Sequence, residues 1–177
     1  MTWLRRMLAR FRQMSNAERW LFLKAYARIF LIDLELRRHG FAYVTRRSVR
    51  FAAGPRPTAT ADQMARARCY ARWLEAAARY HVVRAHCLHR SLTLHQWLRE
   101  EGVPSEPCIG VRRDGRELRA HAWVELGGDV VNDDPSAVAT FIPLRRLSTP
   151  PAATTADTDG SPEGDLGGFN TRASGWR

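Results

Sequence analysis

The stretch EPCIGVRRDGRELRAHAWVELGGDVVNDDP, residues 106–135, restricts the fold more than any other part of the chain. Two strand-like runs flank Asp114–Gly115, and a third run follows Gly127–Gly128. An Asp-Gly pair between such runs is the strongest short-range signal of a β-hairpin, because both residues tolerate the backbone angles of a tight turn. This half of the chain is therefore predicted to form an antiparallel meander of three strands.

Helices are predicted before this meander. Ser15 with Glu18, and Thr60 with Gln63, have the spacing of a capping box, in which each side chain satisfies a free backbone N–H group at a helix start. The first helix has a broad apolar face and is expected to stop near Gly40. The second is amphipathic, and the intervening RRSVRFAAGPRPTAT is predicted to be a connector.

A third helix is predicted from Cys87 to Gly102. Together with the meander it predicts an α+β domain at residues 59–147, preceded by a helical extension and connector at residues 1–58. Residues 148–177 are rich in Pro, Gly, Ser, Thr and Asp, a composition that predicts a disordered tail.

Charge is distributed unevenly along the chain. The formal net charge is +10, and residues 1–72 hold sixteen basic residues against four acidic ones. A basic surface favours acidic peptides, nucleic acid or anionic lipid, although an arginine-rich surface can also simply be solvated. A hydrophobic content of 45% excludes wholesale disorder.

Cysteine usage and hydropathy predict a cytoplasmic protein. Cys69, Cys87 and Cys108 cannot all pair, and no CxxC spacing occurs. The most apolar stretch, WLFLKAYARIFLIDLELRRHG, contains four charged residues before its final RR pair, which argues against a membrane span. The basic N-terminus lacks the apolar core of a signal peptide.

Cys87 is the first candidate for chemistry. Backbone N–H groups and the positive end of a helix dipole favour a thiolate at a helix start, which makes the sulfur a better nucleophile. Such a cysteine needs a base and a group that orients this base. His121 on the second strand is the candidate base, and Asp133 and Asp134 after the third strand are the candidate orienting groups.

The length of the second loop decides between the two aspartates. A three-residue loop, 127–129, would place Asp133 on the same face as His121 as a diagonal neighbour. A two-residue loop, 127–128, would place Asp134 directly opposite His121. The residues alone leave this open.

The order Cys, His, Asp at a helix start, a strand and the next strand is that of papain-like and transglutaminase-like enzymes. It predicts an α+β fold with a papain/transglutaminase-like core, in which the nucleophile helix packs on an antiparallel sheet behind an N-terminal helical extension. Residues 87–134 also resemble the transglutaminase-like cysteine peptidases that mature lasso peptides, the stand-alone leader peptidases or lasso-peptide B proteins. The motifs in common are Cys87 with Arg90-Ser91-Leu92, LREEG, IGVRR, HAWVEL and NDD, and the helical lead-in ERWLFLKAYARIFLIDLELRRHGF is similar as well.

This resemblance implies Cys87 as the nucleophile, His121 as the base and Asp133 as the orienting carboxylate, with Asp134 in reserve. The implied activity is removal of the leader from a ribosomally made precursor peptide through an acyl-enzyme. No cofactor and no metal are implied.

Residues 1–80 contain nothing similar to the family's leader-recognition module. The resemblance therefore implies a separate recognition protein as a partner, together with an ATP-using macrolactam cyclase. No phosphate-binding loop is present, so no nucleotide site is assigned. Arg84, His86 and the backbone N–H of Cys87 all remain candidates for binding an oxyanion.

Three alternatives are weighed against this interpretation. One is a zinc site, one is a basic nucleic-acid-binding module without catalysis, and one is an acyl or glutaminyl transferase that uses the same three residues. The zinc site lacks a second ligand pair at regular spacing. No nucleic-acid-binding motif accompanies the arginines, so no nucleic-acid partner is predicted. The zinc candidates are His81, His86, Cys87, His89 and His95.

Overall fold

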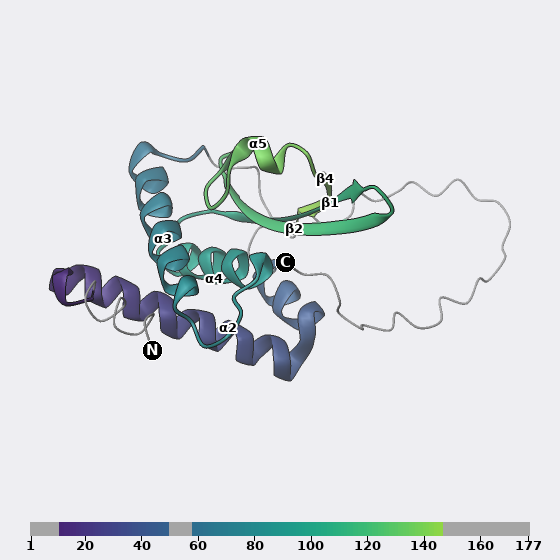
Figure 1. Cartoon of the computed structure of the whole chain (residues 1–177). Coiled ribbons are helices and arrows are strands. Elements are labelled where there is room, and N and C mark those ends of the chain that lie inside the picture. Colours follow the sequence, from purple (N-terminus) through teal and green to yellow (C-terminus); the bar gives the residue numbers. More distant parts are fainter. Residues whose placement is uncertain (1–10, 50–57, 147–177) are drawn as a thin grey trace, which may run out of the picture.

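The structure is a computed structural model that describes residues 11–49 and 58–146 of the 177-residue chain. The predicted tail and most of the glycine- and proline-containing connector lie outside these residues. The described elements form two layers, a sheet carrying a short helix and a group of three longer helices beneath it (Figure 1). The prediction of an α+β fold is confirmed. In chain order the elements are α2 (Asn16–Val49), α3 (Ala61–Arg79), α4 (Cys87–Glu100), β1 (Glu106–Asp114), β2 (Glu117–Leu126), β3 (Asp129–Val130), α5 (Pro135–Val138) and β4 (Ile142–Arg146).

Both predicted capping boxes are present. The Thr60 hydroxyl accepts a hydrogen bond from the backbone N–H of Gln63, and the Gln63 side chain accepts one from the Thr60 N–H. Ser15 and Glu18 make the same reciprocal pair before α2, with the Ser15 N–H 2.8 Å from Oε2 of Glu18. These local bonds set where α2 and α3 begin.

The predicted helix end at Gly40 is only partly correct. Gly40 has φ 75° and ψ 170°, values outside the helical region, so the regular helix breaks there. A further helical segment continues to Val49, where the sequence predicted that the connector had already begun.

One core joins the helices to the sheet. α4 lies between α2 and β2, and α3 packs against both α2 and α4 (Figure 1). Trp97 of α4 is fully buried and stacks on Tyr70 of α3 with ring centroids 4.3 Å apart. Phe22 and Ile29 bring α2 into this core, and Val124 brings in β2. The packing holds the start of α4 against the sheet.

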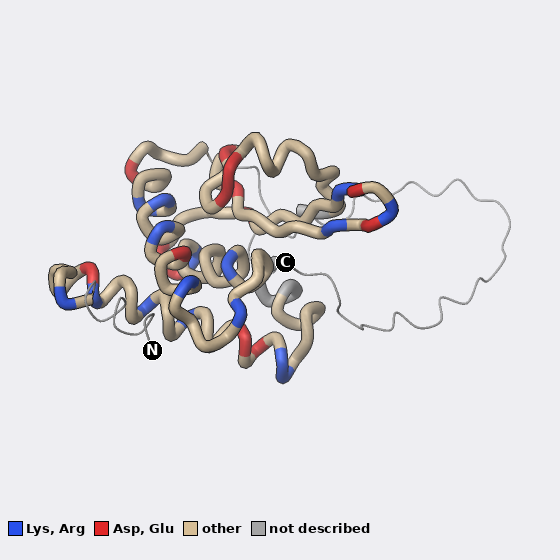
Figure 2. The backbone as a smooth tube through the Cα atoms, in the orientation of Figure 1, with Lys and Arg blue, Asp and Glu red and all other residues tan. Residues whose placement is uncertain are grey.

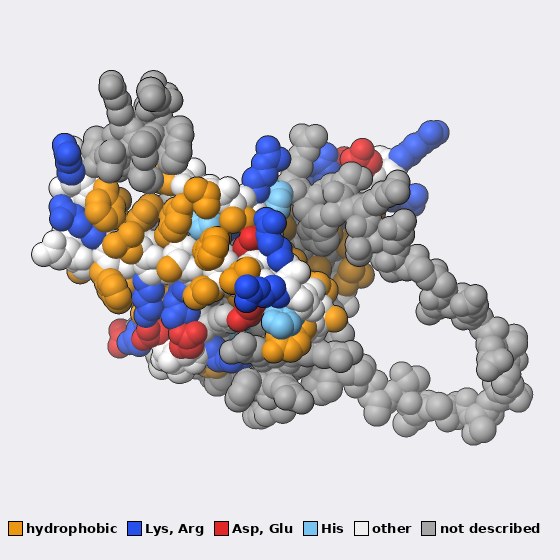
Figure 3. Space-filling model, turned by 90° about the horizontal axis from the view of Figure 1, so that it is seen from below, with side chains coloured by type: hydrophobic (Ala, Val, Ile, Leu, Met, Phe, Trp, Pro, Cys, Tyr) orange, Lys and Arg blue, Asp and Glu red, His pale blue; other side chains and the backbone are white. Residues whose placement is uncertain are grey.

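The outward face of α2 keeps exposed apolar side chains. Trp20, Leu23, Phe30 and Leu31 are between 48% and 66% exposed, and hydrophobic side chains gather along this face in Figure 3. Among the described residues, no helix is both long and apolar enough to cross a membrane.

The sheet has the strand order β3-β2-β1-β4 and is antiparallel throughout. The predicted hairpin is confirmed, since Asp114 pairs with Glu117 and Gly115 adopts φ 61° in the turn. The sequence missed β4, which pairs with β1 on the far edge. Its residues Ile142 and Leu144 are both exposed, so they lack the inside–outside alternation that reveals a half-buried strand.

Candidate active site

The loop between β2 and β3 contains two residues. Leu126 pairs with Asp129, so the loop is the tight alternative that would place Asp134 opposite His121. That pairing is never reached, because β3 ends at Val130 and the chain leaves the sheet before either aspartate. The third strand is thus shorter than either predicted register requires, and the expectation that it extends to the aspartates is wrong.

Asp133 is the aspartate that contacts His121. The Nε2 atom of His121 donates to Oδ2 of Asp133 at 2.6 Å, and both side chains are partly buried. Asp134 is the N-cap of α5, where its Oδ1 accepts from the backbone N–H of Ser136 at 2.9 Å and from its hydroxyl at 2.8 Å. The two neighbouring carboxylates therefore have different structural roles.

Cys87 is the first residue of α4 and only 3% of it is exposed. Burial alone would raise the pKa of its thiol. Hydrogen bonds from the His121 side chain and from the backbone N–H groups of Ala122 and Leu88 outweigh burial, so the pKa of Cys87 is lowered overall. The helix start thus stabilises a thiolate.

The first turn of α4 lies against the edge of β2 that β3 leaves uncovered. The Ala122 N–H faces Cys87, and the Ala122 carbonyl accepts a hydrogen bond from the Ser91 hydroxyl at 2.9 Å. Further along this edge, the Val124 N–H donates to Oδ1 of Asn132 at 2.7 Å, and Nδ2 of Asn132 donates to Ser91 at 3.2 Å. Side chains therefore take the place of the missing strand and fix Cys87 beside β2.

His121 lies between the cysteine and the carboxylate. Its hydrogen bond to Asp133, followed by that to Cys87, raises the pKa of His121 to about 9, while the bond from His121 lowers the pKa of Asp133. At neutral pH the imidazole is therefore protonated and Asp133 is ionised. Because the pKa of Cys87 is lowered as well, the site favours a thiolate–imidazolium pair.

Aromatic rings flank the imidazole. The ring centroids of Phe141 and Trp123 lie 5.1 Å and 6.3 Å from that of His121. Trp123 is 2% exposed, packs with Val138 of α5, and donates from Nε1 to Glu125 at 2.9 Å. Trp123 therefore covers the sheet beneath α5.

Gly110 is paired with His121 across the β1–β2 ladder and makes room for the Trp123 ring. A Cβ atom on Gly110 would lie 2.8 Å from Cη2 of Trp123 and 3.0 Å from the carbonyl oxygen of Ile142. We expect Gly110→Ala to lower the free energy of unfolding by about 1–3 kcal/mol through overpacking, measured by urea denaturation. The cost should shrink in the Trp123→Leu background, which frees space; an equal cost in both backgrounds would show that this ring is not the obstacle.

Of the candidate zinc ligands, His86 and His89 have ring centroids 5.9 Å apart, whereas His81 and His95 have other partners. Nε2 of His81 donates to the Tyr26 carbonyl at 3.0 Å, and its Nδ1 accepts from the Val83 N–H at 3.0 Å. His95 is buried with Nδ1 3.0 Å from the Ser105 hydroxyl. Within the described part of the chain, no three His, Cys, Asp or Glu side chains are grouped so that they could hold a metal ion.

Comparison with known proteins agrees with this architecture. The sequence model of the transglutaminase-like superfamily matches residues 29–146, about two thirds of the chain. The chain therefore belongs to the transglutaminase-like superfamily. No curated protein and no solved structure matches the chain.

Sequence reasoning gave no structural role to Ser91 and Asn132. Both lie in short motifs that carry the resemblance, next to Arg90 and Asp133. Their hydrogen bond joins α4 to the segment after β3, two elements 41 residues apart in sequence. For Ser91 a signal was available, since a polar residue on the buried side of α4 requires a hydrogen-bonding partner.

Proposed function

We propose that this protein is a cysteine peptidase that removes the leader from a ribosomally synthesised lasso precursor peptide. The observation that carries the proposal is the continuous set of hydrogen bonds from Cys87 through His121 to Asp133. Membership of the transglutaminase-like superfamily supports a cysteine peptidase or transferase in general. The motifs similar to lasso leader peptidases support the narrower substrate class.

Each of the three residues has a defined task in the proposed reaction. The Cys87 thiolate attacks the scissile carbonyl carbon and forms a tetrahedral intermediate. The protonated His121 gives its proton to the leaving amine as the C–N bond breaks, which leaves a thioester on Cys87. His121 then takes a proton from water as the water oxygen attacks the thioester. Collapse of the second tetrahedral intermediate breaks the C–S bond and releases the leader carboxylic acid, which loses its proton to solvent. This regenerates the Cys87 thiolate and the protonated His121. Asp133 holds the ring and stabilises its charged form.

The proposed pathway requires partners. We propose a separate leader-recognition protein and an ATP-using macrolactam cyclase, all acting in the cytoplasm, with no cofactor in the peptidase itself. The exposed apolar face of α2 supports a protein partner, because contiguous apolar surface commonly marks an interface.

An acyl or glutaminyl transferase is the second candidate function. Superfamily membership favours it as much as hydrolysis, because both reactions pass through the same acyl-enzyme and differ only in the nucleophile that enters. Product masses separate them, since transfer adds the acceptor amine where hydrolysis adds water. A non-catalytic nucleic-acid-binding module would leave the Cys87–His121–Asp133 arrangement without a role.

The first test is intact-mass analysis of a lasso precursor peptide incubated with the protein and its recognition partner. We expect a leader-sized loss with wild type and with Cys69→Ala, and none with Cys87→Ala. Cys69 is the matched control because it is a cysteine on α3 outside the site. Equal cleavage by Cys87→Ala would eliminate Cys87 as the nucleophile and, with it, the proposed mechanism.

A further inference from the structure

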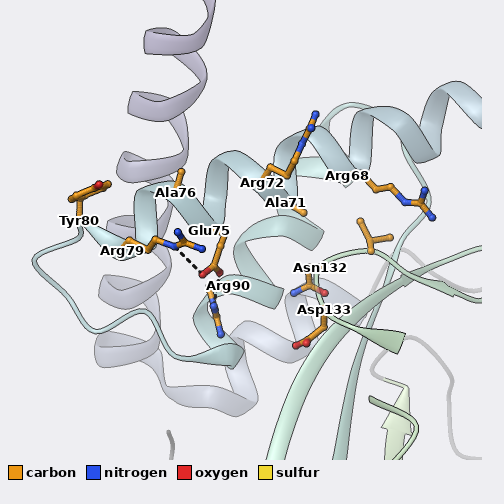
Figure 4. A pocket seen from close by; sticks show the side chains of 11 residues that line it. Arg68, Ala71, Arg72, Glu75, Ala76, Arg79, Tyr80, Arg90, Asn132 and Asp133 are labelled. Carbon is orange, nitrogen blue, oxygen red and sulfur yellow. Dashed lines mark hydrogen bonds and ion pairs between the residues drawn. The ribbon is translucent and has the colours of Figure 1, made fainter. Parts of the chain in front are cut away.

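A groove of about 700 Å³ runs along α3 and reaches the candidate active site (Figure 4). One wall is the face of α3, and the other is formed by Arg90 of α4 and by the segment from Val131 to Asp133. We call this feature the arginine groove, because Arg68, Arg72, Arg79 and Arg90 all line it. Asp133, at its end, also contacts His121, so the groove adjoins the reacting groups.

The acidic groups in the arginine groove are already paired. Oε2 of Glu75 accepts from Arg90 at 2.5 Å, and its Oε1 lies 3.6 Å from Nε of Arg79. Asp133 is engaged by His121. The carboxylates therefore offset part of the charge of the arginines, and a net positive charge is left for a ligand.

Arg68 and Arg72 carry this remaining charge. Both are exposed, and neither forms a hydrogen bond or ion pair with any residue that the structure describes. The two arginines are four positions apart on α3, and Glu75 and Arg79 follow at steps of three and four. All four side chains therefore lie on the same face of the helix. Two guanidinium groups are thus available to bind carboxylates or phosphates in two-point geometry.

The spacing of the arginines favours an extended chain over a single small anion. Figure 4 shows Arg68, Arg72 and Arg79 spread along α3. The eleven positions from Arg68 to Arg79 span roughly 16 Å at the helical rise of about 1.5 Å per residue. An extended peptide covers that length with about five residues.

We propose that the arginine groove binds an acidic segment of the peptide substrate and holds it next to the bond that Cys87 attacks. This inference rests on the proposed peptidase function for its biological meaning. The binding itself does not require cleavage. The net charge of +10 assists the encounter with an acidic peptide.

The test uses fluorescein-labelled hexaglutamate as the probe and fluorescence anisotropy of the full chain in the Cys87→Ala background. The groove variant is Arg68→Glu with Arg72→Glu. Its matched control is Arg113→Glu with Arg116→Glu, which changes the net charge equally at the exposed tip of the β1–β2 hairpin, far from α3 in Figure 2. Circular dichroism verifies that each variant is folded.

We expect hexaglutamate to bind and a Gly-Ser hexapeptide not to bind. The groove variant should weaken binding by at least about tenfold, and the control by less than about twofold. Equal weakening by both variants would show that only the overall charge matters and would overturn the proposal. Tighter binding of a dodecamer of deoxythymidine, lost in the same variant, would replace the peptide by a nucleic acid.

Cleavage separates this inference from the proposed function. The groove variant with Cys87 intact should raise KM for the precursor with little change in kcat, which identifies a loss of binding. An unchanged KM together with normal cleavage would refute the groove alone. Normal hexaglutamate binding together with cleavage by Cys87→Ala would refute the peptidase mechanism alone.

Discussion

His121→Ala is expected to abolish precursor cleavage, with a loss on the order of 10⁴-fold or more. Two contributions disappear together. The hydrogen bond and positive charge that lower the pKa of Cys87 are lost, and so is the proton donor for the leaving amine. The rate is measured from product masses over time, next to His39→Ala, which removes an exposed histidine of α2 whose ring lies against that of Tyr43.

The same variant has a readout that does not depend on a substrate. The ultraviolet absorbance of the thiolate, taken as the difference from Cys87→Ser, follows ionisation of Cys87 against pH. His121→Ala should move this transition to higher pH. Burial raises the pKa of the Cys87 thiol, and the variant lacks the hydrogen bond and charge of His121 that lower it. A transition that stays in place would show that the helix start and Ala122 alone set the pKa of Cys87.

Asp133→Asn is expected to lower kcat on the order of 10²- to 10⁴-fold, whereas Asp134→Asn should keep nearly full activity. Asn replaces Asp well as an N-cap, so the second variant preserves the start of α5. Only Asp133 accepts the hydrogen bond from His121. Precursor cleavage by the two variants is compared at several pH values, and the reverse order of activities would move the orienting role to Asp134.

The pH dependence has a defined sign. Asp133 is the largest cause that raises the pKa of His121 from 6.5 to about 9, so Asp133→Asn should lower it and shift the alkaline limb of the activity profile to lower pH. The raised pKa also stabilises the folded protein. That contribution is fully present below pH 6.5 and is lost as the pH rises through about 9. Urea unfolding should therefore show the variant less stable at neutral pH, with the difference narrowing above pH 9.

Local signals account for what could be predicted from the sequence. The capping pair of Thr60 and Gln63 involves residues three positions apart, and the hairpin turn at Gly115 needs only its own backbone angle. The start of α4 at Cys87 follows from a change in residue pattern over a few positions. Each of these features is decided within a single turn or helix end, so neighbouring residues were sufficient.

Features that depend on distant segments could not be predicted in this way. β3 has only two residues, and beyond it the side chains of Asn132 and of Ser91 on α4 make hydrogen bonds to β2 in place of a longer strand. Because the chain leaves the sheet, Asp133 contacts His121, although the register of the two-residue loop would place Asp134 opposite it. Residue periodicity identifies the face of a strand only as far as the strand continues, and β3 ends before both aspartates.

The brevity of β3 has a consequence for how the chain can vary. The number of residues from Gly127 to Asp133 is fixed by the contacts at the end of this segment. One inserted or deleted residue would bring a different side chain to His121 and shift Asn132 away from Ser91. The hairpin tip at Gly115 projects from the sheet, away from α3, and carries no such constraint. The tip is therefore expected to tolerate natural insertions and engineered tags, while the seven-residue segment 127–133 after β2 keeps a constant length.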